Sequence, residues 1–177
     1  MTTIRLTTWV NAPVERCFLL ATSTDFSSLL SNEVLTRPAG PDSLKLGDSL
    51  GWRMGWNKQL YTSRIDAIRP YSYFRETMVS GIFQNYEHDH HFAQMDDGTR
   101  VRNEIRFRTR LGPVGRLVEL TMLRASLAKM LATRNTELKR LAESNEWQKY
   151  VEASDVTRET VTVNEPQKMV SNMQRFA

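Results

Sequence analysis

The sequence predicts an α+β fold in which a curved antiparallel sheet of about six to seven strands wraps around one long C-terminal helix. Two observations support this fold class. Apolar and polar residues alternate through most of the chain from residue 49 to residue 109. The stretch that follows, about thirty residues without glycine or proline, has leucines at helical spacing. At 177 residues, the chain matches the usual size of a single domain.

The N-terminal segment predicts a strand followed by two short helices. Side chains alternate between apolar and polar from residue 4 to residue 10, which is the period of a strand with one buried face. Asn11 as a cap, Pro13 in the first turn and the apolar residues 17–20 predict a helix over 13–22. Residues 25–30 are expected to form a second short helix. The prolines and glycines of 35–49 predict a loop.

The central part of the chain predicts an antiparallel meander. Five alternating segments are separated by turn residues: 49–56, 59–68, 72–79, 84–94 and 99–109. Ser80-Gly81 and Asp97-Gly98 supply turns between them. In the last segment, apolar residues and Asn103 share one face and four arginines share the other, so one face of the sheet is expected to be solvated.

The C-terminal part divides into a helix and an extension. Leucines recur three, four or seven residues apart, which predicts a helix over about 115–144. Residues 1–144 are therefore expected to form the domain, and 145–177 an accessory extension. In that extension, Met169, Val170, Met173 and Phe176 fall on one helical face.

Composition excludes several classes of protein. Apolar residues make up 40% and charged residues 25%, which is ordinary for a globular protein and not for a disordered one. The net charge of +4 is small for a dedicated nucleic-acid binder. The single cysteine and the absence of a signal-peptide pattern in MTTIRLTTWV lead us to expect a cytoplasmic protein with no membrane span.

The segment SGIFQNYEHDHHFAQMDDGTRVRNEIRFRTRLGPVGRL carries a recognisable motif. It contains glycine-x-phenylalanine, H-x-H-x-F, glycine-threonine and a proline-glycine step into the last helix. With the order of elements, this pattern resembles the SRPBCC superfamily, which includes START domains, birch-pollen-allergen proteins and polyketide cyclases, and most closely its bacterial cyclase-like branch. The residues that carry the resemblance are His88, His90, Phe92, Gly98, Thr99, Gly112 to Gly115 and Arg134.

The resemblance spans about residues 2–142 and implies the helix-grip fold. It also implies binding of a small hydrophobic or amphipathic molecule between the sheet and the long helix. Asn103 stands where this branch is expected to have an aspartate, which weakens any chemistry that needs an acid at that position.

Strand periodicity places polar residues in the interior. Alternation puts Phe74, Glu76 and Met78 inward on one strand and Tyr86, His88, His90 and Phe92 inward on the next, with Asn85, Glu87, Asp89 and His91 facing water. A hairpin folding at 80–84 makes Glu76 and His88 cross-strand neighbours. The Asp-Gly turn brings Asn103 opposite or diagonal to His90.

Buried polar groups are costly unless they are paired or reach a water-filled cavity, so this cluster is the main functional clue. Three interpretations stay open. Glu76, His88, His90 and Asn103 form a satisfied hydrogen-bond network, or they anchor a ligand, or the histidines and Glu76 bind a metal. We expect no metal and no cofactor, because an H-x-H metal site of the cupin type would want a glutamate where this chain has Gln94.

The expected ligand site combines polar anchors with an apolar lining. Its candidate residues are Trp52, Met54, Phe74, Glu76, Met78, Tyr86, His88, His90, Asn103, Ile105, Phe107 and Arg134. Arg134 lies on the apolar stripe of the long helix and is expected either to form a structural ion pair or to clamp a ligand's carboxylate or phenolate. Cys17 is expected to be a buried thiol, and the arginine row a solvated face.

The sequence therefore predicts a non-catalytic protein that binds a small hydrophobic or amphipathic ligand. One alternative is a cyclase or dehydratase in which His88 or His90 acts as general base and Glu76 orients it. A protein–protein interaction module, and a homodimer, stay open. No nucleic-acid partner is expected.

Overall fold

The computed structural model describes residues 1–30, 43–54, 59–81, 83–110, 112, 117 and 119–151. The strands are β1 (Thr2–Val10), β2 (Ser49–Met54), β3 (Gln59–Arg69), β4 (Tyr73–Ser80), β5 (Phe83–Met95) and β6 (Gly98–Thr109). The helices are α1 (Val14–Thr22), α2 (Thr24–Leu30), the π-helix η1 (Glu119–Leu123), α4 (Arg124–Ala142) and the 3-10 helix η2 (Asn145–Lys149). The predicted order of elements is confirmed.

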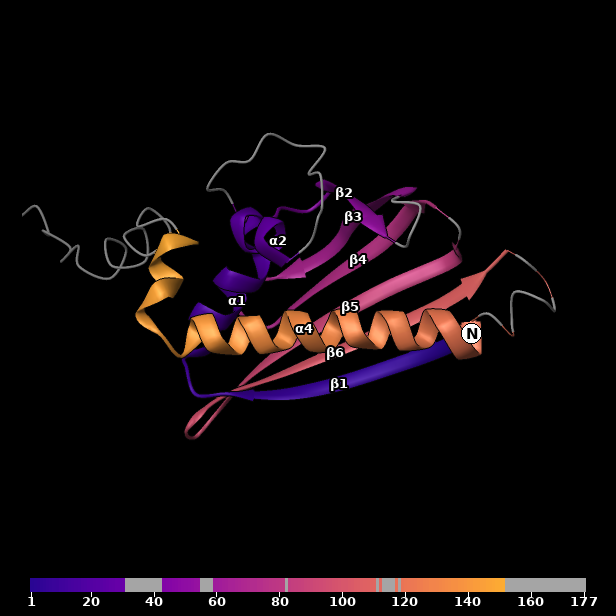
Figure 1. Cartoon of the computed structure of the whole chain (residues 1–177). Coiled ribbons are helices and arrows are strands. Elements are labelled where there is room, and N and C mark those ends of the chain that lie inside the picture. The colour runs from indigo at the N-terminus through magenta and orange to yellow at the C-terminus, as the bar shows by residue number, and fades with distance from the viewer. Residues whose placement is uncertain are drawn as a thin grey trace, which may run out of the picture.

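The six strands form one antiparallel sheet in the order β1-β6-β5-β4-β3-β2. The long helix α4 lies along one face of this sheet, while α1 and α2 cover one end of the same face (Figure 1). Lys139 of α4 donates to the backbone oxygen of Trp9 at 2.8 Å, and Arg16 of α1 donates to the backbone oxygen of Ala142 at 2.9 Å. These bonds fix the C-terminal end of α4 against β1 and α1.

The turn between β5 and β6 falls at residues 96–97, one residue before the predicted Asp97-Gly98 turn, since Met95 pairs directly with Gly98. Gly98 has a φ of +155°, and a Cβ there would lie 2.3 Å from the backbone oxygen of Val10. The glycine is therefore required by close packing against the end of β1.

The interior holds two separate apolar clusters. The first lies around α1 and the C-terminal half of α4, and includes Val10, Phe18, Phe74, Phe92 and Leu138. The second lies beneath the N-terminal half of α4, and includes Ile4, Tyr86, Ile105, Phe107 and Leu131. Residues 145–151 add to the first cluster through Trp147, Tyr150 and Val151. The extension beyond residue 151, with the predicted apolar face at 169–176, lies outside the described residues.

The outer face of the sheet is charged, as predicted, but one residue on it is not solvated. Asp89 was expected to face water and is instead buried. It accepts hydrogen bonds from Tyr73, from Arg75 at 2.7 Å and from Arg106 at 2.7 Å. Burial alone would raise the pKa of Asp89, but these donors outweigh burial and lower it. The prediction was wrong because alternation fixes the face of a side chain and not its coverage by long neighbours.

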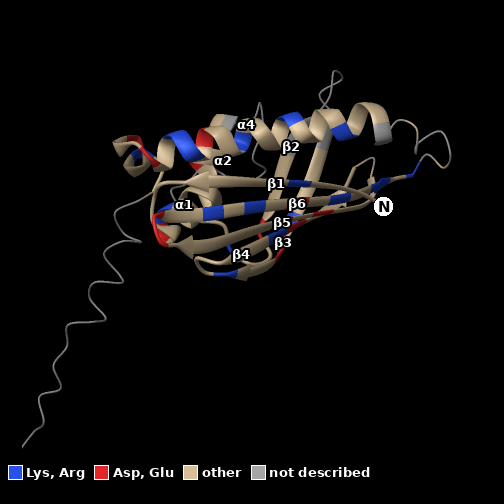
Figure 2. Ribbon diagram, turned by 90° about the horizontal axis from the view of Figure 1, so that it is seen from below, with Lys and Arg blue, Asp and Glu red and all other residues tan. Residues whose placement is uncertain are grey.

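The arginine row on β6 is also paired within the chain. Glu104 forms ion pairs with Arg5 at 2.9 Å and Arg102 at 3.0 Å. Figure 2 shows the Lys and Arg positions as blue bands along β6. Within the row, Arg102 and Arg106 are thus paired with neighbouring carboxylates.

Candidate functional site

A layer of polar side chains crosses the interior between the two apolar clusters. Along β5 the inward residues run Tyr86, His88, His90, Phe92, so both histidines separate one cluster from the other. On β4 and β6 as well, a polar residue stands between a residue of the first cluster and a residue that contacts or belongs to the second. The polar layer consists of Thr8, Glu76, His88, His90, Asn103, Arg134 and Asn135.

Strand pairing assembles this layer as the sequence predicted. Glu76 of β4 pairs with His88 of β5, and His90 pairs with Asn103 of β6. Glu76, His88, His90 and Asn103 are 4, 3, 2 and 1% exposed. Their side chains therefore lie where solvent cannot hydrate them, and every polar atom needs a partner in the protein or in a ligand.

The rings of this layer are stacked. His90 is stacked on Phe74 with ring centroids 3.9 Å and planes 11° apart, and the ring of His88 contacts that of His90 at 3.7 Å with a tilt of 37°. The Glu76 carboxyl oxygen Oε1 is 3.5 Å from Nε2 of His90, so Glu76 approaches its diagonal neighbour and not only its direct cross-strand partner. Packing thus holds both imidazoles in fixed orientations.

Both imidazoles are neutral near pH 7. Burial lowers the pKa of His88 well below its ordinary value, and the nearby His90 lowers it further. Burial likewise lowers the pKa of His90, followed by the charge of Arg134. The contact between His90 and Glu76 is accordingly not a fully charged ion pair.

Asn135 is a member of the layer that sequence reasoning missed. Its Oδ1 accepts from Asn103 Nδ2 at 3.0 Å, and its own Nδ2 donates to Thr8 Oγ1 at 2.8 Å. The available signal was its position four residues after Leu131 and three before Leu138, on the apolar stripe of α4. This chain of bonds ties α4 to β6 and β1.

Three atoms of the layer are left without a hydrogen bond. Nε2 of His88, Nε2 of His90 and Oδ1 of Asn103 are buried and form no well-aligned hydrogen bond among the described residues. Nε2 of His90 does lie 3.5 Å from Oε1 of Glu76, and the Asn103 side chain acts on the pKa of both imidazoles. Leaving such a group unsatisfied costs about 1–3 kcal/mol. Three such atoms in one layer make its burial costly unless a further group pairs with them.

Arg134 borders the layer without completing it. Its Nη2 donates to the backbone oxygen of Ala21 at 3.0 Å, and its guanidinium lies 5.5 Å from the centre of the Phe26 ring. The structural ion pair expected from the sequence is not seen for Arg134 among the described residues. Its clamp role stays a prediction.

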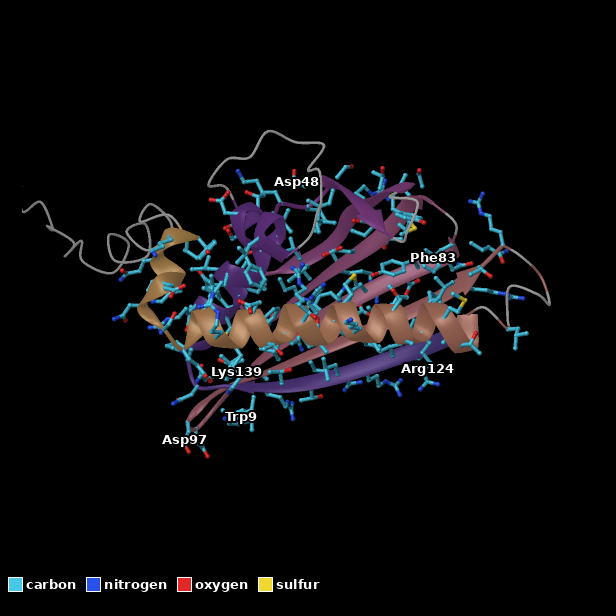
Figure 3. The ribbon with its side chains drawn as sticks, in the orientation of Figure 1. Trp9, Asp48, Phe83, Asp97, Arg124 and Lys139 are labelled. Atoms are coloured by element: carbon cyan, nitrogen blue, oxygen red, sulfur yellow. The ribbon has the colours of Figure 1, made fainter. Side chains whose placement is uncertain are left out.

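The predicted apolar lining is distributed around the layer. Phe74 belongs to the first apolar cluster, while Tyr86, Ile105 and Phe107 belong to the second, against which the partly buried Met78 packs. Figure 3 labels Phe83, the first residue of β5 and a member of the second cluster. Trp52 and Met54 lie in β2, but their side chains lie outside the described part of the structure.

Cys17 has no part in this site. It is fully buried in the first cluster, and burial raises the pKa of its thiol to about 11. A thiol that stays protonated is a poor nucleophile, as expected from its sequence context.

Comparison with solved structures gives matches over most of the chain. The Aha1 dimer from Colwellia psychrerythraea has a TM-score of 0.62 at 15% identity, covering 81% of this chain and 97% of that one. Ara h 8.0201 has a TM-score of 0.54 at 13% identity over 77% of this chain and 97% of its own. The chain has the helix-grip fold.

A third helix-grip structure, the KanY protein, matches with a TM-score of 0.63 at 14% identity, covering 81% of this chain and 98% of its own. No protein-family model and no curated relative matches the sequence. The similarity is therefore one of fold, and it includes the strand order and the long helix packed on the sheet. No helix among the described residues is both long and apolar enough to cross a membrane.

Proposed function

We propose that this chain binds a small, mostly apolar molecule carrying a hydroxyl or carbonyl group, held between α4 and the sheet. The observation that supports this most strongly is the set of three buried polar atoms without partners, on His88, His90 and Asn103. A ligand oxygen at the polar layer removes their cost of about 1–3 kcal/mol each. The resemblance to the SRPBCC superfamily points in the same direction.

The chemistry of the ligand follows from these atoms. Oδ1 of Asn103 only accepts, so it calls for a donor such as a hydroxyl group. A neutral imidazole nitrogen donates or accepts according to its tautomer, which suits either a hydroxyl or a carbonyl oxygen. Apolar clusters on both sides of the layer favour an apolar frame on either side of that group.

A pair of probes that differ by one hydroxyl group tests the proposal. We expect 2-naphthol to bind more tightly than naphthalene by about fivefold, the equivalent of one net hydrogen bond. The variant N103L should remove this preference by removing the acceptor. The control H91Q, on the exposed face of the neighbouring strand β5, should retain it. Probe fluorescence on titration gives both affinities.

Absence of binding by both probes, or a preference that persists unchanged in N103L, contradicts the proposal. Circular dichroism in the near ultraviolet shows whether N103L keeps its native packing. If it does not, the wild-type preference and an N103S variant, which shortens the acceptor without adding bulk, decide the question.

A cyclase or dehydratase using His88 or His90 as general base is the second candidate, because both free Nε2 atoms are able to accept a proton. Their lowered pKa values make them weak bases at neutral pH, which favours binding over proton transfer. Glutamine at both positions separates the two functions. A binding protein then loses only affinity, whereas an enzyme loses turnover of bound ligand.

A further inference from the structure

Glu76, His88 and His90 bring three metal-ligating atoms together in the polar layer. One oxygen of Glu76 and one nitrogen of each histidine all lie within 4.8 Å of one another. The arrangement follows from the sheet. His88 and His90 are two residues apart on the inward face of β5, and Glu76 is paired beside them on β4. Three ligands therefore converge from two adjacent strands.

The two histidines present buried nitrogen atoms that can bind a cation. Nε2 of each ring forms no well-aligned hydrogen bond in the described structure, and that of His90 already lies 3.5 Å from Oε1 of Glu76. A cation satisfies a buried imidazole lone pair as completely as a hydrogen bond does. The stacking of His90 on Phe74 and its contact with the His88 ring hold the rings in place, so little side-chain freedom is left to lose on binding.

We propose that Glu76, His88 and His90 bind one divalent first-row transition-metal ion. Two imidazole nitrogens and one carboxylate are a donor set that suits Zn²⁺, Co²⁺, Ni²⁺ and Fe²⁺ and does not suit Ca²⁺ or Mg²⁺. Three protein ligands leave at least one coordination position open to water or to a ligand. Asn103 Oδ1, buried beside the histidines, is the acceptor for a hydrogen of that water.

The sequence argument weighed both histidines and Glu76 as a metal site and expected none, because Gln94 stands where a cupin-type site would have a glutamate. In the structure, Glu76 of β4 supplies a carboxylate to the same group. Gln94 has another task, because its Oε1 accepts from the backbone nitrogen of Val14 at 3.0 Å. The metal site does not rest on the proposed ligand binding, although both use the polar layer.

Nearby charge sets the strength of the site. Arg134 lies close enough to lower the pKa of both histidines, and it opposes a bound cation in the same way. Asp89 and Glu76 act in the opposite direction. Replacing Arg134 with glutamine should therefore tighten metal binding, whereas a site elsewhere in the chain would not respond.

Cobalt is the probe that tests the site, because its visible absorption reports on nitrogen and oxygen ligands. Protein freed of metal with a chelator should bind one Co²⁺ per chain, and Zn²⁺ should displace it. E76Q, H88Q and H90Q should each weaken binding by more than the roughly 10–100-fold that loss of a supporting group costs. H91Q removes the chain's remaining histidine and should leave affinity unchanged.

Two results overturn the proposal: a Co²⁺ spectrum that stays that of the aqueous ion, or an H91Q variant that weakens binding as much as H88Q. If the variants at buried positions do not fold, the wild-type protein alone can test the metal site. Paramagnetic Co²⁺ must then shift the NMR signals of His88 and His90 far beyond their diamagnetic range. The naphthol test is carried out on chelator-treated protein and is independent of the metal test. One proposal can therefore fail while the other holds.

Discussion

Acidification should destabilise this fold through its two interior histidines. In the unfolded chain a histidine has a pKa of about 6.5. In the fold, burial lowers the pKa of both His88 and His90 well below that value. The neighbouring His90 lowers the pKa of His88 further, and the charge of Arg134 lowers that of His90 further. Below about pH 6.5 the unfolded chain therefore takes up protons that the folded chain does not, and folding becomes less favourable.

The sign and size of the effect follow directly. A lowered pKa in the fold means that stability is complete above about pH 6.5 and is lost as the pH falls below it. Each neutral buried histidine contributes a slope of about 1.4 kcal/mol per pH unit, and two contribute about 2.7. Carboxylates add little until the pH nears their unfolded values of about 4. The window between about pH 6.5 and 5 therefore reports on histidines.

Urea unfolding at a series of pH values through this window measures the slope. The third histidine, His91, also has a pKa lowered by burial, but it is largely exposed and adds less. We expect the double variant H88Q/H90Q to lose most of the slope and H91Q to keep most of it. A free energy of unfolding that stays flat from pH 7 to about 5 refutes the assignment of neutral buried imidazoles.

Other perturbations test the packing around the layer. Replacing Asn135 with leucine should cost about 2–3 kcal/mol, because both of its hydrogen bonds vanish and the amide of Asn103 stays buried; chemical denaturation measures the loss. Gly98→Ala should cost about 2 kcal/mol or more, since its Cβ would meet the Val10 backbone; thermal unfolding reports it. Cys17 should react with a thiol reagent only as the chain unfolds, since it is buried and its pKa is about 11. Trp147→Ala should lower the free energy of unfolding by about 1 kcal/mol, since the Arg16 guanidinium lies 4.8 Å from the centre of the Trp147 ring. Deletion of residues 152–177 should leave the core folded.

Each of these has a contradicting outcome. An unchanged midpoint for Asn135→Leu would mean that its bonds are not formed in solution. Rapid labelling of Cys17 in the native protein would place the thiol at the surface. Failure of the chain to fold without 152–177 would show that the extension belongs to the core, against the predicted boundary.

The sequence was sufficient to predict which side chains face inward. Alternation along β5 and a hairpin centred between residues 76 and 88 put Glu76 beside His88 and Asn103 beside His90, as the register confirms. Both predictions depend on geometry that every antiparallel pair shares, since side chains point to opposite faces in turn. Predictions of this kind do not depend on how the individual side chains pack.

What the sequence did not predict depends on side-chain reach across elements. Asn135 looked like one polar residue among many on α4, and only its contacts identify it as a link to Asn103. The burial of Asp89 arises from Tyr73, Arg75 and Arg106 closing over it. The approach of the Glu76 carboxyl group to His90, its diagonal neighbour, is a further example. The alternation of apolar and polar residues gives the face on which a side chain lies but not which neighbouring side chains it contacts.

The imidazole NMR spectrum of metal-free, ¹⁵N-labelled protein tests the central claim, that the polar layer is a binding site, most directly. The chain has three histidines, so each ring gives an assignable signal. On titration with 2-naphthol, the Nε2 signals of His88 and His90 should shift together and saturate, while those of His91 stay in place. Signals of His88 and His90 that remain unmoved while the probe binds elsewhere would contradict the claim.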